Sequence, residues 1–189
     1  KLGTAVLIAP YRHPLSAARQ FATIDLLSNG RLLLGVGPGW LREEFDALGV
    51  PFERRGDRTD EYLQAMRTAW SDERASFNGD FINFNEVYSR PQPVDRHVPI
   101  IVGGHSKRAA RRAGQFGDGF FPGRGRPEEL SELFDHARRS AEQYGRDPSA
   151  LEFTAGGPTT PEFVEQLAAI GVSRMIAVSY THLRAHEPE

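Results

Sequence analysis

The residues best suited to chemistry lie in four short stretches that are rich in glycine and polar side chains. The first is Gly3-Thr4-Ala5-Val6, which leads into the loop Pro10-Tyr11-Arg12-His13-Pro14. Its small residues let the backbone approach a flat ring closely, and Thr4 adds a hydroxyl group; a well-packed strand threonine gives the same pattern. His13 precedes a proline, which favours an extended loop conformation. It is a weak catalytic candidate, because a solvated loop histidine fits the pattern as well.

The second stretch is Gly35-Val36-Gly37-Pro38-Gly39-Trp40. Glycines at alternate positions near a strand end expose the backbone to a ligand. The spacing does not meet the G-x-G-x-x-G pattern of dinucleotide-binding loops. Trp40 offers a broad apolar face that could stack on a ring, or it could anchor the core.

The third and fourth stretches favour an anion. Gly103-Gly104-His105-Ser106 precedes a predicted helix, Ser106 is a good N-cap, and first-turn amides behind two glycines can bind phosphate. A capped helix with a solvated basic face is the alternative. The fourth stretch runs from Gly117 to Arg126, and its glycines and two arginines, Arg124 and Arg126, extend the same anion-binding rim. The cations near the third stretch are Lys107, Arg108, Arg111 and Arg112.

Composition and missing motifs exclude several functions. With 23 basic and 25 acidic residues the net charge is −2, which gives no general attraction to nucleic acid or to a membrane. The sequence has no cysteine, and no apolar run approaches the ~20 residues of a membrane span. We find no P-loop, no G-x-S-x-G motif, no paired strand-end carboxylates and no metal site. A phosphate site with few titratable groups suits a cofactor that carries its own chemistry, and we expect a cytoplasmic enzyme.

The elements that must position these stretches alternate between short apolar strands and amphipathic helices. This alternation predicts a parallel sheet, either open and doubly wound or closed as a barrel. Strands are predicted over residues 2–8, 31–36, 99–102, 118–121, 151–155 and 174–178, and helices over residues 15–27, 40–48, 57–70, 106–116, 127–144 and 161–170.

Residues 71–98 break this alternation. They contain Phe77-Asn78-Gly79-Asp80-Phe81, a hairpin-like turn between aromatic residues, followed by several prolines. Long excursions within a compact domain usually serve as lids or binding loops, and we expect a lid here.

Six strands are two fewer than an eight-stranded barrel needs. Two βα units would then be missing, leaving two unpaired sheet edges, and we expect poor solubility or self-association of the chain as it stands. Residues 178–187 resemble a translated sequencing adapter. His182 and His186 have the spacing of a helical metal pair, but we expect residues 178–189 to be a non-native tail without function.

A longer stretch, LGTAVLIAPYRHPLSAARQFATIDLLSNGRLLLGVGPGWLREEFDALGVPFERRGDRTDEYL, resembles the luciferase-like monooxygenase superfamily, specifically its branch that depends on the deazaflavin F420. PIIVGGHSKRAARRAGQFGDGFFP continues this resemblance, which covers about residues 1–177. It implies a (β/α)8 TIM barrel with a lid insertion, of which this chain lacks the first two βα units. It also implies a non-prolyl cis peptide at Ala5–Val6. The cofactor would lie against Thr4, Ala5, Val6, Gly37, Pro38, Gly39, Trp40, Gly103, Gly104, His105, Ser106, Gly123 and Arg124.

Two departures from the family limit what the resemblance implies. The family's second strand, which often supplies catalytic groups, is absent, and Trp40 stands where some F420-dependent dehydrogenases have glutamate. The leading hypothesis is an F420-dependent oxidoreductase, either a hydride-transfer enzyme or a monooxygenase, that acts on a small organic molecule; a homodimer is the assembly we consider. FMN is the rival cofactor. A non-redox phosphate-binding isomerase or aldolase, and a non-catalytic cofactor binder, are the alternatives.

Overall fold

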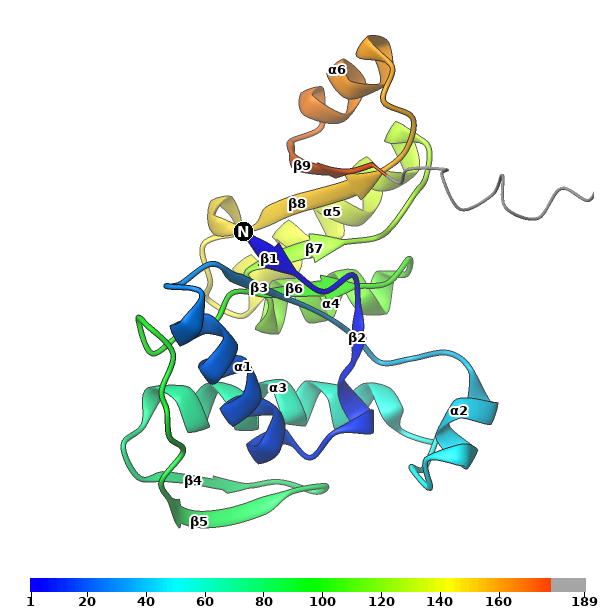
Figure 1. Cartoon of the computed structure of the whole chain (residues 1–189). Coiled ribbons are helices and arrows are strands. Elements are labelled where there is room, and N and C mark those ends of the chain that lie inside the picture. The colour runs from blue at the N-terminus through cyan, green and yellow to red at the C-terminus, as the bar shows by residue number, and fades with distance from the viewer. Residues whose placement is uncertain (178–189) are drawn as a thin grey trace, which may run out of the picture.

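A parallel sheet organises the chain, of which the computed structural model describes residues 1–177 (Figure 1). The sheet contains β1 (Leu2–Gly3), β2 (Leu7–Ile8), β3 (Leu32–Gly37), β6 (Ile100–Gly103), β7 (Gly119–Phe121), β8 (Glu152–Gly156) and β9 (Val172–Ile176). β1 and β2 both pair with β3, so the strand predicted over residues 2–8 is interrupted, not continuous. The chain therefore supplies six strand positions, as the alternation predicted.

The strand order decides between the two predicted architectures. Neighbours follow the chain order β1-β3-β6-β7-β8-β9, and every pairing in this sheet is parallel. Each crossover therefore moves one position in the same direction, as in a (β/α)8 barrel, whereas a doubly wound sheet reverses direction. Within the described residues β1 and β9 each pair on one side only.

The helices begin and end where local sequence signals place them. They are α1 (Pro14–Leu27), α2 (Arg42–Ala47), α3 (Arg55–Ser71), α4 (Lys107–Phe116), α5 (Pro127–Gln143) and α6 (Pro161–Ala169), with short 3-10 helices at Ala9–Tyr11 and Pro148–Ala150. Proline opens α1, α5 and α6, where a missing N–H costs nothing. Asn29 and Gly30 end α1 with positive φ angles of 55° and 69°, as predicted. No helix among residues 1–177 has the length and apolarity to cross a membrane.

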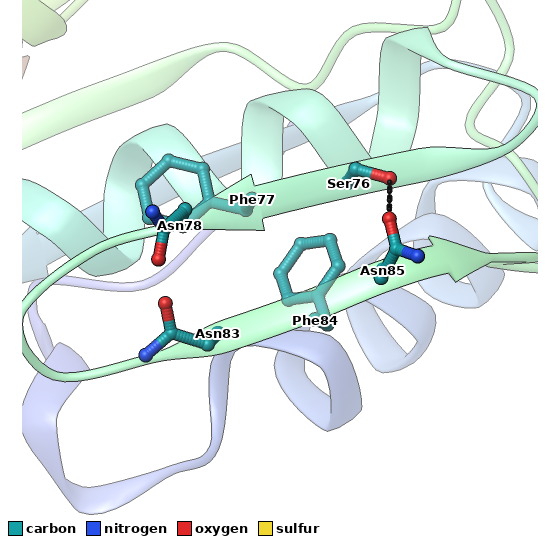
Figure 2. A pocket seen from close by; sticks show the side chains of 6 residues that line it. All are labelled: Ser76, Phe77, Asn78, Asn83, Phe84 and Asn85. Carbon is teal, nitrogen blue, oxygen red and sulfur yellow. Dashed lines mark hydrogen bonds between the residues drawn. The ribbon is translucent and has the colours of Figure 1, made fainter.

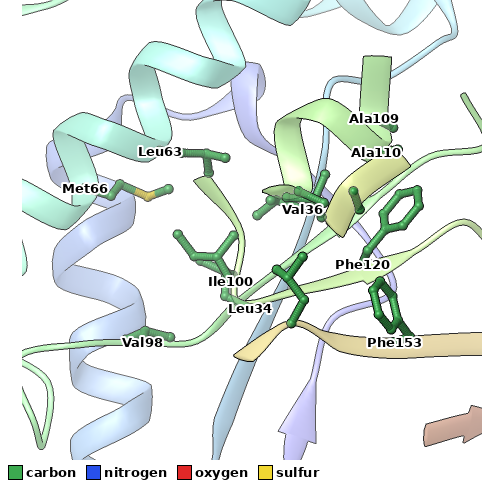
Figure 3. Packing of buried hydrophobic residues seen from close by; sticks show 14 of the residues in the cluster. Leu34, Val36, Leu63, Met66, Val98, Ile100, Ala109, Ala110, Phe120 and Phe153 are labelled. Carbon is green, nitrogen blue, oxygen red and sulfur yellow. The ribbon is translucent and has the colours of Figure 1, made fainter. Parts of the chain in front are cut away.

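The core lies between the sheet and its helices (Figure 3). Alternate residues of β3 show how the sequence divides the two faces of the sheet. Leu34 and Val36 are fully buried against the helices, whereas Leu33 and Gly35 line a cavity on the other face. The helical side of the core includes Leu63 and Met66 of α3, Ala109 and Ala110 of α4, and Phe134 of α5. This packing fixes where each strand ends.

The excursion at residues 71–98, for which the sequence predicted a lid, forms an antiparallel hairpin. β4 (Ala75–Asn78) and β5 (Asn83–Val87) pair beside α3, away from the parallel sheet (Figure 1). The carboxylate of Glu61 in α3 accepts hydrogen bonds from the backbone N–H groups of Asp80, Phe81 and Ile82 at 2.7–2.8 Å. These charge-assisted bonds hold the hairpin tip against the outside of α3. The role of a lid stays a prediction.

The outer face of the hairpin carries a shallow depression that the sequence did not reveal. It has a volume of about 450 Å³, and the rings of Phe77 and Phe84 stack across it with centroids 6.0 Å apart (Figure 2). The Ser76 hydroxyl donates to the Asn85 side chain at 3.0 Å on the same face. No charged residue lines the depression, which also contains Asn78 and Asn83.

Candidate cofactor site

The central feature of the candidate site is a bulge at residues 4–6, where β1 stops and β2 has not begun. The peptide bond between Ala5 and Val6 is cis, as the resemblance implied. The Thr4 hydroxyl donates a hydrogen bond to the Gly35 carbonyl oxygen at 2.7 Å. The bulge is thus attached to the neighbouring strand by a side chain where the regular ladder is interrupted.

Glycines on the two next strands make room for this bulge. A Cβ on Gly35 would overlap the carbonyl oxygen of Thr4, and one on Gly103 would lie 2.7 Å from Val6 Cγ1. At Gly37 a Cβ would lie 3.1 Å from Val6 Cγ2. Alanine fits none of these positions without movement, because real Cβ atoms do not approach so closely. We predicted that glycines at the end of β3 expose backbone to a ligand; the structure shows that they accommodate Thr4 and Val6.

A cavity of about 220 Å³ opens on the inner face of the sheet beside the bulge. Residues 1–6 line one side of it, and its other walls come from five later strands, β3, β6, β7, β8 and β9. Those walls consist of Leu33, Gly35, Ile101, Phe121, Thr154, Arg174 and Ile176. Arg174 is already engaged, since it donates to the Thr154 hydroxyl at 3.1 Å and pairs with Glu152 at 2.5 Å. The cavity is therefore mainly apolar, with Lys1 and the paired Arg174 as its cations and no lining carboxylate or histidine.

The start of α4 lies next to the bulge at the end of β6. Ser106 caps the helix by accepting a hydrogen bond from the Ala109 N–H at 3.2 Å, as predicted. Residues 104–108 are exposed, so the amides of Lys107 and Arg108, which have no acceptor inside the helix, lie in an exposed part of the first turn. Lys107 and Arg108 form no ion pair with any residue that the structure describes. This end of α4 has the chemistry of an anion site.

The loop after β7 runs beside this helix start. The Gly104 N–H donates to the Phe121 carbonyl oxygen at 3.2 Å, and His105 Nδ1 lies 3.1 Å from the Pro122 carbonyl oxygen. Gly123 has a positive φ of 94° and open space where a Cβ would be, so its backbone is accessible. The side chain of Arg124 turns towards the next loop, where its Cγ would lie 3.3 Å from a Cβ on Gly156.

Three other predicted residues have different surroundings. Trp40 is 79% exposed in the loop between β3 and α2, so the interpretation as a core anchor is wrong. Gly39, next to Pro38, has a positive φ of 79°, and a Cβ there would lie 2.8 Å from the Phe45 ring. His13 caps α1 by accepting the Leu15 N–H at 3.3 Å, which gives it a structural role at the surface.

Sequence reasoning missed two groups of residues at the same edge of the sheet. Thr154, Arg174 and Ile176 come from the last two strands and line the cavity beside the bulge. Gly156 and Gly157 follow β8 and line a second cavity with Arg124. The pair Gly156-Gly157 after a predicted strand was the signal that could have identified the second group.

The carboxylates with perturbed pKa values lie elsewhere. Burial raises the pKa of Asp60, which pairs with Arg112 between α3 and α4. Burial also acts to raise the pKa of Asp118, but the hydrogen bond from His97, the charge of Arg67 and the Ile100 N–H lower it to about 2. Asp118 precedes β7, and Ile100 begins β6, so this group lies at the amino ends of the strands. Neither carboxylate lines a strand-end cavity.

Residues 1–176 match the sequence profile of the luciferase-like monooxygenases. The chain belongs to the luciferase-like monooxygenase family. This match covers all the elements described above and agrees with the strand order of a luciferase-like TIM barrel.

Individual relatives differ in their cofactors. An uncharacterised protein of Mycobacterium tuberculosis is 42% identical over 103 residues, covering 54% of this chain and 36% of the relative. An FMNH(2)-dependent dimethylsulfone monooxygenase of Pseudomonas putida is 36% identical over 149 residues, covering 77% and 41%. The chain thus spans less than half the length of these two relatives.

Among solved structures, an F420-dependent secondary alcohol dehydrogenase in complex with an F420-acetone adduct superposes with a TM-score of 0.79. The superposition covers 93% of this chain and 72% of that one at 20% identity, so it supports the fold alone. These similar proteins thus include both an F420-dependent and an FMN-dependent enzyme, and both cofactors are of the flavin type.

Proposed function

We propose that the full-length protein is an oxidoreductase that binds reduced F420 and acts with it on a small organic substrate. The observation that carries this proposal is the bulge at residues 4–6, held against Gly35 and Gly103 and next to the exposed start of α4. It combines a backbone surface for a flat ring with an anion site for a phosphate. FMN, the cofactor of the Pseudomonas putida relative, is the rival.

The described residues fit such a cofactor by their chemistry. The cavity beside the bulge has apolar walls from Ile101, Phe121 and Ile176, which suit an aromatic ring. The first-turn amides of α4, with Lys107 and Arg108, suit a phosphate. Gly123 adds accessible backbone beside them.

When bound, the cofactor supplies the two-electron chemistry that these side chains do not have. The protein residues would bind the cofactor and orient it. The bulge and Gly35 fix the plane against which a ring can lie, and the apolar walls keep water away from it. Since no histidine, aspartate or glutamate of residues 1–177 lines either strand-end cavity, proton transfer is not assigned to any described residue. His13 stays a prediction for that role.

A non-redox isomerase or aldolase is less well supported. Such enzymes need a lysine or carboxylate at the carboxyl end of a strand. Lys1 is the only such residue of the described chain that lines either cavity, and it lies at the amino end of β1. A non-catalytic cofactor binder would bind the same cofactor but show no turnover.

Titration of the full-length protein with F420 and with FMN, followed by the fluorescence of each cofactor, tests the proposal. We expect both to bind and F420 to bind more tightly. Tighter binding of FMN would assign the rival cofactor, and binding of neither would refute the proposal.

Two substitutions at one position test the phosphate assignment. Asp and Asn are both good N-caps, so Ser106→Asp and Ser106→Asn preserve the helix start, but only Asp adds a negative charge. We expect Ser106→Asp to weaken cofactor binding about tenfold or more and Ser106→Asn to change it little. Equal affinities of the two variants would place the phosphate elsewhere.

A further inference from the structure

A second cavity lies one loop further along the strand ends than the proposed phosphate site. Its volume is about 550 Å³, and it is formed by the loops after β7 and β8 together with the start of α6. Residues 103–106, at the start of α4, do not line it. The cavity is lined by Arg124, Gly125, Arg126, Pro127, Gly156, Gly157, Pro158, Thr159, Phe163 and Ala177.

The two arginines that line this cavity differ in their electrostatic state. Arg126 is neutralised by Glu129, which lies 2.6 Å from Arg126 Nη2. Arg124 forms no ion pair and no side-chain hydrogen bond with any residue that the structure describes. Arg124 is therefore the cation in this cavity that can receive an external anion.

The backbone around Arg124 holds the side chain at the cavity. The Gly156 N–H donates to the Gly123 carbonyl oxygen at 2.9 Å, so the loops after β7 and β8 run side by side. Because Gly156 has no side chain, the aliphatic part of Arg124 can lie across it, with Arg124 Cγ 3.3 Å from the position of a Cβ. The Arg124 side chain thus lies against the loop after β8, where it lines the cavity.

The remaining walls are apolar with one hydroxyl. A Cβ on Gly157 would lie 2.4 Å from Phe163 Cε1, so glycine lets the backbone pass directly over this ring. Phe163, Pro158 and Ala177 form an apolar surface, and Thr159 adds a hydroxyl group. A free guanidinium beside an apolar wall is suited to a small molecule with an oxyanion at one end and an apolar body.

We propose that this cavity is an anion subsite for the substrate, with Arg124 as the residue that selects a carboxylate or phosphate on an apolar body. The proposal rests on the proposed function, because it names the substrate class of that enzyme. It also separates Arg124 from the cofactor phosphate, to which the sequence had assigned it. Two anions would then bind on either side of the loop after β7: the cofactor phosphate at α4 and the substrate at Arg124.

The experiment uses the full-length protein and a matched pair of probes. Phenylacetate carries an oxyanion on an aromatic body, and phenylacetamide is its neutral analogue. Affinities are measured by calorimetry or ligand-observed NMR for wild type, Arg124→Gln, Arg124→Lys and Arg126→Gln. The affinities of all four proteins for F420 and FMN are measured in parallel, and circular dichroism verifies that each is folded.

We expect wild type to bind phenylacetate about tenfold more tightly than phenylacetamide. Arg124→Gln should abolish this preference, Arg124→Lys should retain most of it, and neither should change cofactor affinity. Arg126→Gln should change phenylacetate binding less than twofold, since that guanidinium is already paired with Glu129.

Three results would overturn the subsite: no preference of wild type for the anionic probe, an equal loss in Arg126→Gln, or a loss of cofactor affinity in Arg124→Gln. The last result would return Arg124 to the cofactor phosphate. Failure of the proposed function is distinguishable, because wild type would then bind neither cofactor whatever the probes show.

Discussion

The two ends of the parallel sheet use their polar residues in opposite ways. At the amino ends of the strands, Asp118 accepts hydrogen bonds from Arg67 and from the Ile100 N–H, both at 2.8 Å. His97 Nε2 lies 3.3 Å and Arg146 Nη2 lies 3.7 Å from the same carboxylate. These residues come from α3, the segment after the hairpin, β6, and the loops before β7 and β8. The charged side chains at this end are thus paired with one another within the protein.

At the carboxyl ends of the strands, cations lack carboxylate partners among the described residues, and glycines stand where side chains would not fit. Lys107, Arg108 and Arg124 have no carboxylate partner among residues 1–177, and the helix start between them is exposed. Glycines replace side chains next to the bulge at residues 4–6. Active sites of barrels lie at this end, whereas polar residues at the other end serve stability. One parallel sheet can thus keep its charges paired at one end and carry unpaired cations at the other.

The largest expected effect tests whether packing at the bulge is as tight as the structure indicates. In Gly35→Ala the new Cβ would overlap the Thr4 carbonyl oxygen, and neither backbone can move without disrupting β3. We expect a loss of about 3 kcal/mol or more in the free energy of unfolding, and loss of cofactor binding. Urea denaturation of the full-length protein measures the first quantity and cofactor titration the second.

Gly3→Ala is the matched control for that substitution. Gly3 lies on β1 just before the bulge, and its Cβ would have an ordinary contact of 3.5 Å with the Leu33 carbonyl oxygen. Its stability should stay within about 1 kcal/mol of wild type. Equal stabilities of Gly35→Ala and Gly3→Ala would show that the bulge is not in close contact with β3.

The second-largest expected effect concerns Asp118, at the amino ends of the parallel strands. Asp118→Asn keeps the size of the side chain but leaves Arg67 and Arg146 without their counter-charge. We expect a loss of about 2 kcal/mol in the free energy of unfolding, less than for a fully buried pair because these side chains are about a quarter to a third exposed. Cofactor affinity of the folded protein should not change.

Asp135→Asn is the control: it removes an exposed ion pair with Arg138 and should lower the free energy of unfolding by no more than about 0.5 kcal/mol. A weakened cofactor affinity in Asp118→Asn would contradict the separation of the two ends.

The same carboxylate predicts a pH dependence. The pKa of Asp118 is about 2 in the folded protein, whereas the ordinary aspartate pKa of 3.8 applies to the unfolded chain. Because the folded pKa is the lower one, its contribution of about 2 kcal/mol is present above pH 4 and is lost as the pH falls towards 2. Roughly 1 kcal/mol should be gone by pH 3. Unfolding free energies of wild type and Asp118→Asn, measured from pH 6 to pH 3, should therefore converge. A constant difference would mean that Asp118 does not titrate in this window.

Much of the fold followed from local patterns in the sequence. Proline at the first position of α1 and Ser106 before α4 set helix starts correctly, and the glycine after Asn29 set an end. Short apolar runs located the strands. The interruption of the first strand could be inferred only from family resemblance, because no propensity in residues 2–8 marks a bulge.

The features that the sequence could not predict depend on contacts between residues distant in sequence. The hairpin lies on α3 because of Glu61, about 20 residues before its tip, and nothing in residues 71–98 indicates that. The glycines of β3 and β6 indicated an unusual strand end correctly. Their physical reason, the space taken by Thr4 and Val6, needs the register between strands, which a single sequence does not contain.

The smallest expected effect concerns the hydrogen bond that holds the bulge in addition to packing. Thr4→Val replaces the hydroxyl by a methyl group of similar size, so only the 2.7 Å hydrogen bond to the Gly35 carbonyl oxygen is lost. A single neutral hydrogen bond contributes about 0.5–1.5 kcal/mol, and we expect a loss near 1 kcal/mol or below in urea denaturation. Thr4→Ser retains the hydroxyl and should recover most of this loss. If Thr4→Val were as damaging as Gly35→Ala, the hydrogen bond and not the missing Cβ atoms would fix the bulge. The carboxyl end would then depend on a polar contact, as the amino end does.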